Sequence, residues 1–182
     1  MLILYLIIGI IVIYFIFTYN SFVSLKNQVL NSFSGIDVQL KKRNDLIPNL
    51  VNVVKGYAKH EKSLLESITK TRSNIIGSLK EKDVEKLSSQ DKKLSNNLKS
   101  LFAVSENYPN LKANKNFLEL QREMSRVENN IAASRRIYNS NVAIFNSKLQ
   151  IFPNNLFNKL LKFDEFKFYE LGEKRSIGIL WV

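Results

Sequence analysis

Residues 2–40 read LILYLIIGIIVIYFIFTYNSFVSLKNQVLNSFSGIDVQL. From Leu2 to Phe17 this stretch is a continuous apolar run, in which Gly9 is the one small residue. A helix of that length covers about 24 Å, slightly less than the ~30 Å hydrocarbon core of a bilayer. The first charged side chain is Lys26, so residues 18–25 can extend the span. We therefore predict a transmembrane anchor in residues 1–25 that contacts the lipid bilayer through residues 2–19.

A cleaved signal peptide is the rival interpretation of the apolar run. It would need a basic start and a small-x-small cleavage site. Met1 is instead followed directly by Leu2, and no such triplet comes after the run. We therefore expect an uncleaved, single-pass anchor. Basic residues follow the span at Lys26 and residues 41–43 but none precedes it, which favours a cytoplasmic soluble domain by the positive-inside rule.

The apolar stripe continues beyond the anchor at three- and four-residue steps, which predicts an amphipathic helix. It runs through Phe22, Leu25, Val29, Phe33, Ile36 and Leu40 and resumes with Leu50, Val54, Tyr57, Leu64, Ile68, Ile75 and Leu79. Pro48 lacks a backbone N–H and clashes with the preceding turn, so it predicts a kink or break near residues 44–47. Because the stripe keeps its phase, we favour a kink in one helix that continues to Leu79.

Three further helices are expected. Asp83 is a candidate N-cap for a helix with heptad-spaced leucines up to Leu101, and residues 107–110 read as a turn. A third long helix should run from about Phe117 to Leu149, and a short one from 154 to 161. Together these segments predict an all-α protein, an antiparallel helical bundle over residues 26–161. The aromatic residues 162–182 are expected to pack on it.

Residues 36–61, IDVQLKKRNDLIPNLVNVVKGYAKHE, carry a longer pattern that resembles the signature of the LemA family of bacterial membrane-anchored proteins. Further matching segments follow in the family's order: Tyr19-Asn20, ENYPNLKANKNFLELQ (106–121), RRIYNSNVAIFNS (135–147) and Phe152-Pro153. Phe33 stands where the family pattern looks to have tryptophan, which keeps an aromatic residue. The resemblance implies one N-terminal transmembrane helix, a long helical bundle and no established enzymatic activity. Some members look to be encoded beside membrane-embedded metalloproteases or other envelope proteins, which implies an adaptor or quality-control role.

The composition excludes several kinds of chemistry. The chain of 182 residues has no cysteine and one histidine, His60, so disulfides, thiol nucleophiles and histidine-rich metal centres are absent. His60-Glu61, with Asp37 and Asp45, is the nearest approach to a catalytic cluster, but HEKSL lacks the second histidine of HExxH. We predict no catalytic residue, no metal and no cofactor.

Nucleic-acid binding is not expected either. The net charge of +11 is distributed along the chain, and no recognised nucleic-acid-binding motif occurs. The partner is expected to be another protein, of unknown identity.

Candidate structural or partner-contact residues centre on the polar string around Pro48. We expect this string to specify the fold at the kink, where backbone groups need partners, or to form a partner-binding surface. Asn139 and Asn146, with Asn141, are expected to face it and complete a buried polar network. The full candidate set is Asp37, Arg43, Asp45, Pro48, Asn49, Lys55, Tyr57, His60, Glu61, Tyr108, Pro109, Asn139, Asn146 and Pro153.

The functional prediction is a non-enzymatic membrane protein whose bundle holds a recognition surface, around the kink and the aromatic tail, at a fixed distance from the bilayer. One alternative is a homo-oligomeric envelope scaffold that uses stripe residues such as Phe102 and Phe145 for lateral contacts. The other is an enzyme centred on His60 and Glu61.

Overall fold

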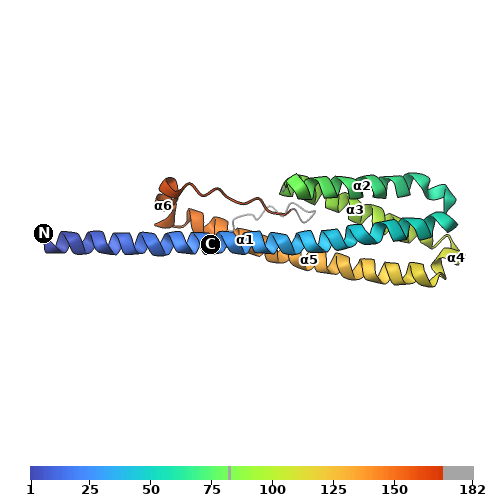
Figure 1. Ribbon diagram of the computed structural model, residues 1–182, viewed down its shortest axis with the longest axis horizontal. Coiled ribbons are helices and arrows are strands. Elements are labelled where there is room, and N and C mark those ends of the chain that lie inside the picture. Colours follow the sequence, from blue (N-terminus) through green and yellow to red (C-terminus); the bar gives the residue numbers. More distant parts are fainter. Residues whose placement is uncertain (82, 170–182) are drawn as a thin grey trace, which may run out of the picture.

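The computed structural model describes residues 1–81 and 83–169, and their regular secondary structure is helical. The elements are α1 (Leu2–Tyr57), the 3-10 turn η1 (Lys59–Glu61), α2 (Lys62–Glu81), α3 (Val84–Ser105), α4 (Pro109–Lys112), α5 (Lys115–Gln150) and α6 (Asn154–Leu161). Figure 1 shows α1 as a rod along the whole molecule, with α5 beside it and α2 and α3 packed along its far half. The predicted all-α bundle is confirmed.

The chain turns back at the far end of α1, which corrects one prediction. The prediction of a single helix that reaches Leu79 is wrong, because α1 ends at Tyr57 and the chain returns as α2. Ala58 leaves the helical conformation, with φ −116° and ψ 69°. The apolar stripe has a polar gap at residues 59–63, and the stripe beyond it keeps its phase. A stripe in phase is equally compatible with a straight helix and with two helices that share one core.

Pro48 does not end α1, which continues through it. A proline at this position leaves the carbonyl oxygen four residues earlier without its usual helical donor. Here that oxygen belongs to Asn44, and the Nε of Arg72 on α2 donates to it at 2.8 Å. The freed backbone group is therefore satisfied by a neighbouring helix.

The remaining helices follow the predicted pattern. Asp83 caps α3 by accepting a hydrogen bond from the Lys86 N–H at 3.1 Å. The expected turn at 107–110 leads into the single turn α4, with Pro109 as its first residue. The third long helix is α5, and the short helix after Pro153 is α6. Local capping and proline signals therefore placed these boundaries well.

The core lies along heptad positions of the packed helices. On α1 these are Phe22, Val29, Ile36, Leu40, Ile47, Leu50 and Val54, and on α5 they are Phe117, Met124, Val127, Ile131, Tyr138, Val142, Phe145 and Leu149. The expectation that Phe145 serves lateral contacts is wrong, because its side chain is fully buried, and Phe102 stacks edge-on against Phe117. The apolar side chains that α1 and α5 expose beside the bundle are Leu30, Val38, Ile137 and Ile144.

An extended segment, residues 162–169, follows α6 and lies along α5 in the opposite direction. Asn146 pairs with the backbone of Phe166, its Nδ2 donating to the carbonyl at 2.9 Å and its Oδ1 accepting the N–H at 3.0 Å. Asn139 makes the same pair with Tyr169, at 2.9 and 2.8 Å. Residues 170–182 of the predicted tail lie outside the described residues, and the division of the chain at residues 25 and 161 stays a prediction.

Candidate functional site

A network of charged side chains lies inside the bundle, where α1, α3 and α5 meet. Arg43 occupies a core heptad position of α1 and is fully buried. Its Nη2 donates to Asp91 of α3 at 2.5 Å, and its Nη1 donates to Glu128 of α5 at 2.8 Å. Burial disfavours the charge on Arg43, but the two carboxylates outweigh it and raise the pKa of the guanidinium.

Two more residues complete the coordination of Asp91. Its other carboxylate oxygen accepts from Arg135 of α5 and, at 2.5 Å, from the Tyr169 hydroxyl. The Arg135 guanidinium also lies 5.3 Å from the centre of the Tyr169 ring, a cation–π contact. Burial above all, and then the charge of Asp91, raises the pKa of the Tyr169 phenol far above its ordinary value.

The network is balanced in charge, since two arginines face two carboxylates. A buried ion pair of this kind contributes little net stability compared with apolar packing, and its best-attested use is to select one register. It ties α1, α3, α5 and the extended segment together at one level of the bundle. The arrangement is therefore suited to holding the helices in one alignment.

Arg43 was among the candidates predicted from the sequence, but its partners were not. Asp91 occupies a heptad position between Val84 and Leu98, where an apolar residue would be expected. A charged residue inside an otherwise apolar stripe was the available signal. Glu128 and Arg135 are likewise seven residues apart on α5, in line with the buried Val142.

The other candidate residues are dispersed. Asp37 and Asp45 lie on α1 about 30 and 18 Å before its end at the helical rise, so they do not form a cluster with His60. The expectation that Asn139 and Asn146 face the Pro48 region is wrong, because both bind the extended segment. Asn141 donates instead to the Gln28 carbonyl. The exposed candidates are Asp45, Pro48, Asn49, Lys55, Tyr57, His60 and Pro109.

The far end of the bundle does bring several candidates together. The Tyr108 hydroxyl, before α4, donates to Glu61 of η1 at 3.1 Å. The Tyr57 hydroxyl accepts from Nδ2 of Asn114, the N-cap of α5, at 3.0 Å. These contacts hold the α1–α2 turn against the α3–α5 connection. Their functional roles stay predictions.

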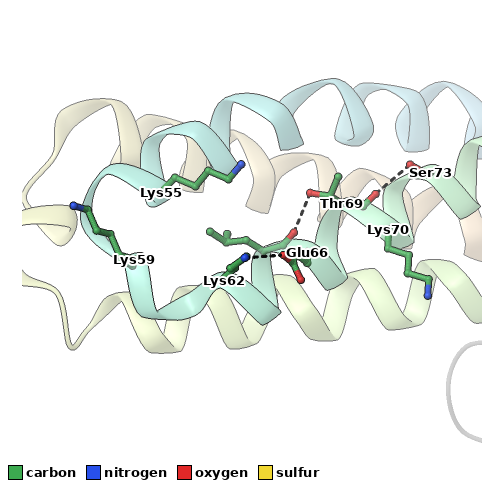
Figure 2. A pocket seen from close by; sticks show the side chains of 9 residues that line it. Lys55, Lys59, Lys62, Glu66, Thr69, Lys70 and Ser73 are labelled. Atoms are coloured by element: carbon green, nitrogen blue, oxygen red, sulfur yellow. Dashed lines mark hydrogen bonds and ion pairs between the residues drawn. The ribbon is translucent and has the colours of Figure 1, made fainter.

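A basic groove of about 660 Å³ opens beside this turn, between the end of α1 and α2. Figure 2 shows Lys55 and Lys59 at the turn and Lys62, Glu66 and Lys70 along α2. Ala58 and Leu65 lie beneath the groove but are only 1% and 3% exposed, so the aliphatic stems of the lysines supply much of its accessible apolar surface. The Nζ of Lys62 lies 3.9 Å from Oε1 of Glu66. Within residues 1–81 and 83–169, Lys55, Lys59 and Lys70 form no ion pair. The groove thus combines the apolar stems of its lysines with excess positive charge.

A second groove of about 670 Å³ lies between α1 and α5 and includes the candidate Asn49. Its charged side chains are two acids and two arginines: Glu119, Arg122, Glu123 and Arg126. Arg126 and Lys42 already pair with Glu123. Because its charges are balanced internally, this groove favours no particular partner charge. Within the described part of the chain, no group of three acidic or histidine side chains is placed to hold a metal ion.

Known proteins resemble this chain along most of its length. Residues 32–177 match the LemA family. This chain belongs to the LemA family. Protein LemA of Metamycoplasma hominis is 30% identical over 181 residues, which cover 97% of this chain and 81% of that protein. The resemblance carried by residues 36–61 and the later segments is confirmed.

Two magnetosome proteins are also similar to this LemA chain. Magnetosome protein MamQ 2 of Paramagnetospirillum magneticum is 23% identical over 175 residues, covering 84% of the chain. Magnetosome protein MamQ of Magnetospirillum gryphiswaldense is 24% identical over 158 residues, covering 74%. The chain spans 64% and 58% of the lengths of these two relatives.

The fold and the family together identify a membrane-associated protein. Among the described residues, α1 is the helix that is long and apolar enough to cross a bilayer. Its residues 2–14 are exposed in the structure, and they extend beyond the bundle in Figure 1. An apolar surface of this size outside a protein core is typical of a segment covered by lipid.

Proposed function

We propose that this LemA protein is a non-enzymatic, single-pass membrane adaptor whose basic groove binds an acidic, amphipathic segment of another protein. The observation that carries the proposal is the continuity of α1. One helix contains both the exposed apolar run and the core of the bundle. In this proposal the anchor stays uncleaved, and the continuous helix fixes the position of the bundle relative to the bilayer.

The groove lies at the end of that helix. From Tyr19, near the end of the apolar run, to Lys55 is about 54 Å along the axis. The Arg43–Asp91 network sets the register between α1 and α3, and the Tyr108–Glu61 bond holds the turn. The bundle therefore presents the groove at a defined distance from the membrane, on the cytoplasmic side by the positive-inside rule.

The charge of the groove selects the kind of partner. Lys55, Lys59, Lys62 and Lys70 line it, against the single acid Glu66 among its lining residues. An amphipathic segment could lay its apolar face on the aliphatic stems of the lysines and place its carboxylates near their ammonium groups. Complementary charge would speed association and favour acidic over basic partners.

Photo-crosslinking in intact cells tests the proposal. A photoreactive phenylalanine analogue at Thr69, in the groove, should crosslink to an acidic segment of a second protein, identified by mass spectrometry. The same probe at Asn130, on the exposed surface of α5, is the positional control. Lys59→Glu with Lys62→Glu should abolish the Thr69 crosslink, whereas Lys93→Glu with Lys99→Glu changes the net charge equally and should preserve it.

Two results would overturn the adaptor proposal. Crosslinks that survive the groove reversal would show that the lysines do not select the partner. Crosslinks to a second copy of this chain alone would favour the homo-oligomeric scaffold, with exposed residues such as Val38 and Ile137 as the lateral surface.

A further inference from the structure

Helix α6 returns to the level of the membrane anchor. Phe157 of α6 packs against Tyr14 and Phe15 of α1, with ring centres 5.4 and 5.6 Å apart. The Tyr14 hydroxyl donates to Asn154 at 3.3 Å. The apolar run ends at Phe17, so these contacts lie about 3 to 5 Å from its end along the helix axis. With α1 spanning the bilayer, a helix beside it at this level would lie close to the boundary between acyl chains and headgroups.

The residues of α6 divide into three faces. Asn154, Phe157, Asn158 and Leu161 recur at helical spacing and contact the rest of the protein. Asn155 and Lys159 form an exposed polar face. The third set, which we call the outer apolar face, consists of Phe152 just before the helix and of Leu156 and Leu160 on it.

The outer apolar face is exposed in the protein alone. Phe152, Leu156 and Leu160 have exposed fractions of 73%, 53% and 74%. Large apolar side chains gathered in this way on a short helix are unfavourable in water. The same side chains are favourable in the acyl region just below the headgroups.

Lysines lie on α6 and on the side of it that faces the bundle. Lys159 and Lys162 are exposed, and the Lys26 Nζ lies 5.9 Å from the centre of the Phe163 ring. Lys148 contacts Ser21 of α1. Long lysine side chains reach headgroup phosphates while their stems stay in apolar surroundings. Asp164 and Glu165 follow in the segment after α6, and Glu165 accepts from Gln150.

We infer that α6 is an interfacial helix, which inserts its outer apolar face into the bilayer surface and so gives the bundle a second membrane contact beside α1. The anchor would fix the depth of the bundle, and α6 would restrict its tilt and its rotation about α1. The inference assumes the transmembrane placement of α1 that the proposed function uses.

Single-cysteine labelling tests the inference directly, because the natural chain contains no cysteine. An environment-sensitive fluorophore would be attached to the full chain in lipid nanodiscs at Leu160→Cys, on the outer apolar face. Lys159→Cys is the matched control on the polar face, Asn130→Cys reports the bundle surface, and Ile7→Cys reports the anchor. Circular dichroism confirms that each variant keeps its helix content.

Nitroxide-labelled lipids then report depth. The Leu160 fluorophore should shift to the blue and lose intensity most with nitroxides just below the headgroups. The Ile7 fluorophore should lose most intensity with deep nitroxides, and the Asn130 fluorophore should lose none. The fluorophore at Lys159→Cys should be quenched less than the fluorophore at Leu160→Cys.

The controls separate failure of this inference from failure of the anchor. If Ile7 is quenched and Leu160 is as accessible to water as Asn130, α6 does not enter the bilayer and the inference is wrong. If Ile7 is not quenched either, the transmembrane placement of α1 is wrong. Disulfide-linked dimers through Leu160→Cys, without lipid quenching, would show that a second copy covers the face and would overturn the inference.

Discussion

Arg72 replaces the backbone donor that Pro48 lacks, because its Nε donates to the carbonyl oxygen of Asn44 at 2.8 Å. With any residue other than proline at position 48, the backbone N–H of that residue would donate to this oxygen within α1. The contact joins α2 to α1 in the middle of the bundle. A proline inside a core helix is therefore tolerated, because the antiparallel neighbour carries an arginine at the matching level.

Replacement of Arg72 by methionine should lower the free energy of unfolding by about 1 to 3 kcal/mol, since the Asn44 carbonyl loses its partner. The effect should shrink when Pro48→Ala supplies a backbone N–H. Urea unfolding of the four members of this double-mutant cycle, followed by circular dichroism in mild detergent, measures the coupling. Arg122→Met, at an exposed arginine, is the control. An Arg72→Met effect of the same size in both backgrounds would contradict the replacement.

Loss of Arg43 should be among the most destabilising changes in the bundle. Arg43→Met leaves Asp91 buried with one arginine fewer, and breaking a buried pair typically costs about 3 to 5 kcal/mol. Asp37→Asn, which removes the pairing of Asp37 with Lys41 on the surface, should change stability by less than about 1 kcal/mol. Thermal and urea unfolding would test the contrast, and equal effects would exclude a special role for the network.

The two asparagines of α5 should protect the backbone of the extended segment. Asn139→Ala removes both hydrogen bonds to the backbone of Tyr169. At about 0.5 to 1.5 kcal/mol for each bond, the Tyr169 amide should exchange roughly 5- to 150-fold faster. Asn146→Ala should have the same effect at Phe166. Hydrogen exchange read by mass spectrometry, with Asn130→Ala as control, measures this. Unchanged protection would show that the segment is held by its aromatic side chains alone.

Tyr169 should make the protein less stable in alkali. Its pKa is raised in the folded state, first by burial and then by Asp91. Below about pH 10 the phenol is neutral in the folded and the unfolded chain, so it does not make stability vary with pH. Above that pH the unfolded chain releases the proton while the folded chain keeps it, so stability falls as pH rises.

The comparison of wild type with Tyr169→Phe isolates this contribution. The variant should lose stability less steeply between about pH 10 and 11, as measured by urea unfolding at a series of pH values. Parallel slopes for the two proteins would mean that the Tyr169 phenol ionises equally readily in both states.

Local patterns predicted most of the helices of this LemA protein, but not the break between α1 and α2. The apolar run at residues 2–17, the Asp83 cap and Phe152-Pro153 each predicted an element that the structure contains, because hydrophobic periodicity, capping and proline act over one or two turns of chain. The family segments at 36–61 and 135–147 were also recognisable from the sequence alone. They identified the family but not which of their side chains meet.

Tertiary packing settled the rest. The stripe from Phe22 to Leu79 could not reveal the reversal at Ala58, since a heptad pattern describes a buried face and not the direction of the next helix. Asp91 pairs with Arg43 across 48 residues of sequence, and nothing local distinguishes it from a surface acid except its place in an apolar stripe. Asn139 and Asn146 are seven residues apart on a helix, and Tyr169 and Phe166 are three residues apart on an extended chain, so each pair spans about 10 Å. This match brings Asn139 to Tyr169 only when the two segments lie side by side.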